Sequence, residues 1–164
     1  MKISIVTPSF NRADYLDDTI ESVLTQAGDF ALEYVVQNAG DSAAVRDILD
    51  RWERAVAAGS FRPRCRELRF AVVHERDSGM YEGINRGFAR CSGDVMAWVN
   101  SDDLYHPAAF QTVTEALAQN TDARWIVGIA NSFNSRGSRA GFDKFPPAYS
   151  REFGHPVTLA LALA

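Results

Sequence analysis

The stretch Met96-Ala97-Trp98-Val99-Asn100-Ser101-Asp102-Asp103 runs from four apolar residues into two adjacent carboxylates. The apolar residues predict a buried strand, so both charges follow its carboxyl end. Neighbouring carboxylates repel each other, and a divalent cation with oxygen ligands stabilises such a placement. The alternative is a helix cap, in which Asp102 or Asp103 begins a helix at Pro107. Taken alone, the pair favours the cap.

Apolar runs and helical spacings alternate along residues 1–130. Apolar runs predict strands at residues 3–6, 34–36, 68–74, 95–99 and 125–129. Helical spacing predicts helices at residues 16–27, 45–56, 80–89 and 107–117, the first of them capped by Asn11 or Asp14 and ended by Gly28. This alternation predicts an α/β fold with three layers, α/β/α, around a mostly parallel central sheet.

Polar turns follow four of the predicted strands, at residues 8–12, 38–42, 75–78 and 100–103. The carboxyl ends of parallel strands lie at one edge of a sheet, where such folds bind their ligands. We therefore expect the four turns to form one site.

The first of these turns reads Thr7-Pro8-Ser9-Phe10-Asn11-Arg12 and offers backbone groups, a flat aromatic ring and a cation. A turn of this kind can hold a base and ribose at the mouth of the sheet. The alternative is a rigid loop with an ordinary helix cap.

Three glycines recur every fourth residue in the stretch from Asp77 to Gly87, at Gly79, Gly83 and Gly87. Each costs a helix about 0.8–1 kcal/mol relative to alanine, so a close approach of backbone or ligand would justify them. Asp77 and Arg86 are candidates for contacts to a base or to phosphates, because arginine donates to a diphosphate in a fork. The alternative is tight helix packing beside a solvated ion pair.

These elements, in this order, resemble the inverting family-two glycosyltransferases of the GT-A fold. The family pattern T-P-[ST]-[FY]-N-R is matched by residues 7–12, and D-x-G-[IM]-Y-[DE]-[GA]-[IM]-N-[KR]-G by residues 77–87. The patterns [AC]-[ST]-G-[DE] and [LV]-N-[SA]-D-D are matched by residues 91–94 and 99–103. The tail D-x-[YF]-x-P-G-[AS] falls on residues 103–109, with Tyr105, Pro107 and Ala109 in place. The resemblance covers about residues 2–130 and implies a Rossmann-like nucleotide-diphospho-sugar transferase fold.

The resemblance also implies a role for individual residues. Asp103 would coordinate Mn²⁺ or Mg²⁺ that bridges the donor diphosphate, and Asp102 would contact the ribose or the donor sugar. The remaining donor-binding residues implied are Thr7, Pro8, Phe10, Arg12, Asn38, Asp77 and Arg86. The sugar of a nucleoside-diphosphate donor, with UDP expected as the nucleotide, would pass with inversion to a saccharide or lipid-linked acceptor in polysaccharide or glycolipid synthesis.

Two features depart from the family pattern. Asn38 stands where the family has an aspartate that accepts a hydrogen bond from uracil; its amide oxygen still accepts, but without charge. No carboxylate matches the family's general base, so the catalytic residue is unknown. We expect residues 1–130 to form the nucleotide-sugar-binding domain, and residues 131–164 a flexible loop and the start of an incomplete acceptor-binding half. A truncated or degenerate donor-binding module without transferase activity is the alternative function.

Composition excludes other classes of protein. The net charge of −4 offers no field for nucleic acid, and the arginines at 62, 64, 66 and 69 form only a local basic loop, solvated or facing an anionic lipid or acceptor. No Gly-x-Gly-x-x-Gly follows the first strand, which argues against a dinucleotide-dependent oxidoreductase. Two distant cysteines predict free thiols and a cytoplasmic protein, with peripheral association at the inner membrane face left open. The oligomeric state is not predicted.

Overall fold

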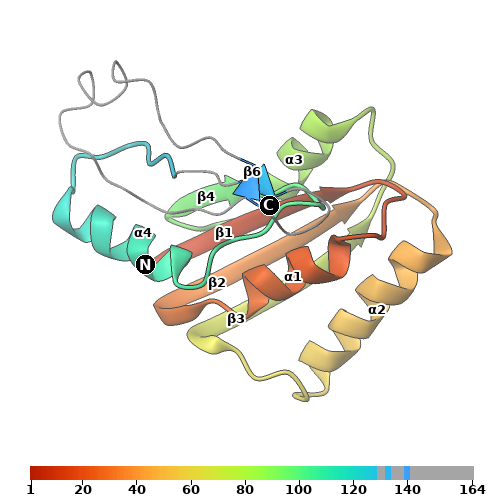
Figure 1. Ribbon diagram of the computed structural model, residues 1–164, viewed down its shortest axis with the longest axis horizontal. Helices are drawn as coiled ribbons and strands as arrows, with labels where there is room; N and C mark the ends of the chain where they lie inside the picture. The colour runs from red at the N-terminus through yellow and green to blue at the C-terminus, as the bar shows by residue number, and fades with distance from the viewer. Residues whose placement is uncertain (129–131, 134–138, 141–164) are drawn as a thin grey trace.

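The computed structural model describes residues 1–128, 132–133 and 139–140. Its main sheet is parallel, with the order β3-β2-β1-β4, and Figure 1 shows β1 at its centre. The strands are β1 (Lys2–Ser9), β2 (Ala27–Asn38), β3 (Arg64–His74) and β4 (Val95–Trp98). The helices are α1 (Leu16–Leu24), α2 (Ala43–Ala57), α3 (Met80–Phe88) and α4 (Ala109–Gln119). A separate antiparallel pair joins β5 (Ser132–Phe133) to β6 (Arg139–Ala140).

The two faces of the sheet carry different helices, because side chains alternate along each strand. Ile3 and Ile5 of β1 belong to the core that α1, α2 and α4 cover. Val6 and Pro8 lie on the opposite face, where α3 approaches them through its glycines. The predicted three-layer α/β/α fold with a parallel sheet is therefore confirmed.

A buried carboxylate ties the strands together at the amino end of the sheet. Glu33 of β2 is only 2% exposed, and its two carboxylate oxygens accept hydrogen bonds from Ser4 Oγ and the Ser92 backbone N–H at 2.7 Å each, and from Arg69 at 2.8 Å. Burial opposes its ionisation, but these hydrogen bonds and the charges of Lys2 and Arg69 outweigh that effect and lower the pKa of Glu33. The turn before β4 is thereby fixed to β1 and β2.

Several predicted boundaries are wrong. β2 begins seven residues earlier than the predicted strand, because Gly28 adopts a left-handed φ of +148° at an irregularity that lets pairing with β3 continue from Ala27. Of the strand predicted at residues 125–129, residues 125–127 form no strand, Trp125 is 76% exposed, and residue 129 lies outside the described residues. The predicted domain boundary after residue 130 lies outside the described residues.

The predicted basic loop is mostly a strand. Arg64, Arg66 and Arg69 lie in β3, where Arg66 pairs with Asp29 and Arg69 with Glu33. Both cysteines are free thiols, as predicted. In the described part of the chain, every helix is too short or too polar to cross a bilayer.

Candidate functional site

The carboxyl ends of β1 to β4 lie at one edge, because all three strand pairings are parallel. The polar segments that follow them, at residues 10–15, 39–42, 75–79 and 99–108, therefore share that edge. The four turns therefore lie at one edge of the sheet, as predicted, and their joint action as one site stays a prediction. The contacts between the turns show which side chains meet.

The first and fourth turns are joined by an ion pair. Arg12 Nη1 lies 3.3 Å from Asp102 Oδ2, although the two residues are ninety positions apart. Phe10 projects from the same turn with 66% of its surface exposed, so its ring is free to stack on a flat ligand. Thr7 is fully buried instead, and its hydroxyl forms a hydrogen bond of 2.9 Å with that of Tyr34. Thr7 thus anchors the start of the turn in the core and is not exposed at the edge of the sheet.

Neither acidic residue of the fourth turn caps a helix. α4 begins at Ala109, its N-cap is Ala108, and no side chain caps it. The helix-cap alternative for Asp102 and Asp103 is therefore wrong. Both carboxylates remain at the end of β4, part-buried and directed to other partners.

Asp103 is part-buried beside Asn100 and Asp102. Burial raises the pKa of Asp103, and so does the charge of Asp102, while a hydrogen bond of 2.9 Å from Asn100 Nδ2 opposes the shift. The other amide atom, Asn100 Oδ1, is buried and has no hydrogen-bond partner. No three metal-ligating side chains meet within the described residues. Magnesium and manganese need fewer, because substrate phosphates complete their shell, so this oxygen set fits a divalent cation.

The third turn contacts the first through a glycine. A Cβ at Gly83 would lie 2.6 Å from Asp77 Oδ2 and in ordinary contact with Pro8 Cβ at 3.7 Å, so a methyl group there would displace the Asp77 carboxylate. A methyl group at Gly87 would overlap Val6. The predicted close approach is confirmed for Gly87, and at Gly83 the tight neighbour is the Asp77 carboxylate. Gly79 differs: it precedes α3 at a φ of +143° with open space around it.

Arg86 is held by two carboxylates. Its guanidinium pairs with Glu82 Oε1 at 2.6 Å and with Glu75 Oε1 at 2.8 Å, and donates to the Arg76 carbonyl. Hydrogen bonds from the Ser78 side chain and backbone, followed by those from Arg86, lower the pKa of Glu82 to about 2. A diphosphate would compete with this pairing, so the donor contact of Arg86 stays a prediction. The spacing of Glu82 and Arg86 by four residues in a predicted helix indicates that the two side chains can form an ion pair.

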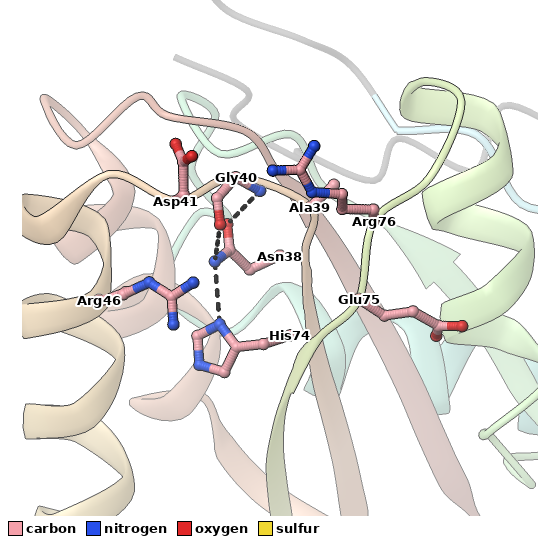
Figure 2. Close-up of a pocket in the computed structure, with 8 residues that line it drawn as sticks. All are labelled: Asn38, Ala39, Gly40, Asp41, Arg46, His74, Glu75 and Arg76. Carbon is pink, nitrogen blue, oxygen red and sulfur yellow. Dashed lines mark hydrogen bonds between the residues drawn. The ribbon is translucent and has the colours of Figure 1, made fainter.

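The second turn borders a small hollow, shown in Figure 2. The residues that line it are Asn38, Ala39, Gly40, Asp41, Arg46, His74, Glu75 and Arg76. Asn38 is 1% exposed, and its amide bonds to Gly40 and to His74 Nδ1. His74 and Arg46 were not predicted, because neither lies in a motif.

Asn11 joins the first turn to the second. Its Oδ1 accepts the backbone N–H groups of Asp41 and Ser42 at 2.8 Å each, just before α2. The backbone of Asn11 has a left-handed φ of +55°. Residue 40 is glycine at this contact, and a Cβ there would overlap the Asn11 side chain. The predicted capping of α1 by Asn11 or Asp14 is therefore wrong: α1 begins after Tyr15 without a side-chain cap.

Comparison with known proteins gives consistent matches. The model of the family "Glycosyl transferase family 2" matches residues 4–156. An uncharacterized glycosyltransferase of Nostoc sp. is 29% identical over 79% of this chain and 35% of its own length. TuaG of Bacillus subtilis, named as a glycosyltransferase of teichuronic acid biosynthesis, is 28% identical over 78% of this chain and 46% of its own. The chain thus spans less than half of these relatives.

Solved structures share the fold. S. aureus TarS 1–349 in complex with UDP-GlcNAc has a TM-score of 0.54 and 17% identity, over 84% of this chain and 37% of TarS 1–349. The mannosyltransferase PcManGT from Pyrobaculum calidifontis, in complex with GDP-Man and Mn²⁺, has a TM-score of 0.51 and 14% identity, over 70% and 31% of the two chains.

Proposed function

The chain belongs to glycosyl transferase family 2, and from this premise we propose that its sheet edge binds a nucleoside-diphosphate sugar together with a divalent cation. The observation that carries the proposal is the meeting of Arg12, Asp102 and Asp103 at the ends of β1 and β4. Neither carboxylate is used to cap a helix, and Asn100 Oδ1 beside them lacks a partner. Structural neighbours that bind UDP-GlcNAc, or GDP-Man with Mn²⁺, support the same ligand class.

Each turn has a separate task in this proposal. Asp103 would hold Mn²⁺ or Mg²⁺, which when bound offsets negative charge on the donor diphosphate. Asp102, fixed by Arg12, accepts a hydroxyl of the ribose or donor sugar. Phe10 and Pro8 border the nucleotide, and Asp77 lies near Pro8 beside Gly83.

The reaction we propose is transfer of the sugar with inversion. An acceptor hydroxyl attacks the anomeric carbon as the bond to the diphosphate breaks, and the nucleoside diphosphate leaves. The proton of the hydroxyl passes to a general base, for which we assign no residue. UDP is the proposed nucleotide, and a saccharide or lipid-linked acceptor in polysaccharide synthesis is the proposed acceptor, in line with the name of TuaG.

Titration of UDP with and without Mn²⁺ tests the binding proposal. We expect binding that requires the metal and that Asp103→Ala abolishes. Asp47→Ala, which removes an exposed carboxylate from α2, is the matched control and should bind as the unmutated chain does. Metal-independent binding, or equal affinity in Asp103→Ala, would overturn the proposal.

Turnover separates the enzyme from the donor-binding module. Incubation with a labelled UDP-sugar and Mn²⁺ should release UDP by transfer or slow hydrolysis, and Asp103→Ala should stop the release. Tight, metal-dependent UDP binding without any release would favour the binding module instead.

A further inference from the structure

The amide of Asn38 can take only one orientation. Its Oδ1 accepts the N–H of Gly40 at 3.2 Å, and its Nδ2 donates to the Gly40 carbonyl at 3.1 Å (Figure 2). A flipped amide would place two acceptors together and two donors together at the same glycine. The backbone of Gly40 therefore fixes which amide atom faces β3.

This orientation decides the tautomer of His74. The second N–H of Asn38 Nδ2 lies 3.0 Å from His74 Nδ1, so that ring nitrogen must accept. A neutral imidazole with one accepting nitrogen carries its proton on the other, here Nε2. Asn38 thereby selects one tautomer of His74 and presents an Nε2–H donor.

His74 lines the hollow between β2, β3 and α2. Arg46 of α2 and Arg76 after β3 also line it, and neither forms an ion pair within the described residues. Asp41 and Glu75 are the carboxylates of the lining, but Glu75 is bound by Arg86 and Arg90, and Figure 2 shows it directed away from His74. Beside the carboxylate of Asp41, the lining therefore offers hydrogen-bond donors from Arg46, Arg76 and His74.

We propose that His74 determines base specificity by donating its Nε2–H to an acceptor atom of the donor's nucleobase, and that Asn38 acts as the positioning residue that sets this tautomer. This inference rests on the proposed function, because it places the nucleobase of the donor in this hollow. Asn38 itself has no free N–H and is buried, so it supports the contact rather than making it. An aspartate at residue 38 could not donate to the Gly40 carbonyl and would draw the imidazole proton to Nδ1.

The tautomer is tested without any ligand. In the full chain labelled with ¹⁵N, we expect a coupling across the hydrogen bond between Asn38 Nδ2 and His74 Nδ1, with the ring proton on Nε2. Asn38→Asp should abolish the coupling and move the proton to Nδ1. If that variant does not fold, the coupling in the unmutated chain decides alone, and a protonated Nδ1 there overturns the positioning role.

The base contact is tested with two probes, UDP and pyrophosphate, each with Mn²⁺. His74→Phe keeps a ring without nitrogen and should weaken UDP binding about 3- to 10-fold, while pyrophosphate binding stays unchanged. His74→Gln keeps a donor at the end of the side chain and should recover most of that loss. Unchanged UDP affinity in His74→Phe, or an equal loss for pyrophosphate, overturns the contact. Absence of UDP binding in the unmutated chain overturns the proposed function, and the ring coupling then still decides the role of Asn38.

Discussion

Replacing Ala108 with glycine should stabilise the domain. Ala108 holds a left-handed φ of +66° immediately before α4, where the family pattern has glycine. This backbone costs an L-residue about 1–2 kcal/mol. Glycine avoids that cost but loses about 0.4–1 kcal/mol through the greater freedom of the unfolded chain. The methyl group is exposed and contributes little burial, so the net gain should be about 0.5–1 kcal/mol.

Thermal unfolding followed by circular dichroism measures this gain. A change of about 1 kcal/mol shifts the Tm of a chain of this size by about 2–4 °C, so we expect a rise of about 1–4 °C. Ala118→Gly is the matched control, because Ala118 is also exposed but lies in right-handed helix; its Tm should fall. A lower Tm for Ala108→Gly would refute the left-handed assignment.

Three further changes test other contacts. Gly87→Ala should cost about 1–3 kcal/mol of unfolding free energy in urea, and Val6→Ala should recover part of it; simple additivity would contradict the proposed overlap. The lowered pKa of Glu33 means that its stabilisation is present above the pKa of an unfolded glutamate and is lost as the pH falls through the folded value. Glu33→Gln should therefore be less stable at neutral pH and lose less on acidification, and parallel losses in both proteins would exclude this role. Asn11→Gly keeps the positive φ but loses the acceptor, so it should lower the free energy of unfolding by about 1–2 kcal/mol. Asn11→Asp keeps an acceptor and should lower it less. An Asn11→Gly variant as stable as the unmutated chain would show that the hydrogen bonds from Asn11 to the residues before α2 do not contribute to stability.

The sheet and its functional edge could be predicted because they follow from local patterns. Apolar runs alternating with helical spacing led to the parallel sheet, and parallel strands bring their following turns together whatever the details of each turn. The glycines at 83 and 87 carried a second reliable signal, since a helix tolerates them only for a packing reason.

Side-chain partners could not be predicted in the same way. Asn11 has the chemistry of a helix cap, but its target depends on a positive φ and on the space at Gly40, which no spacing reveals. His74 carries no motif, and its relation to Asn38 depends on the register between β2 and β3. The start of β2 was missed because an irregularity after Gly28 interrupts the alternation that marks a strand.

The central position of β1 has a consequence for synthesis on the ribosome. β1 can pair with β2 early, but its other neighbour, β4, begins about 60 residues after β2 ends. At about 5–20 residues per second, translation leaves that edge of β1 waiting roughly 3–12 s for its partner. An open strand edge is a template for pairing with other chains. The interval between β2 and β4 is thus the period in which a nascent chain of this fold most needs protection from its neighbours on the polysome.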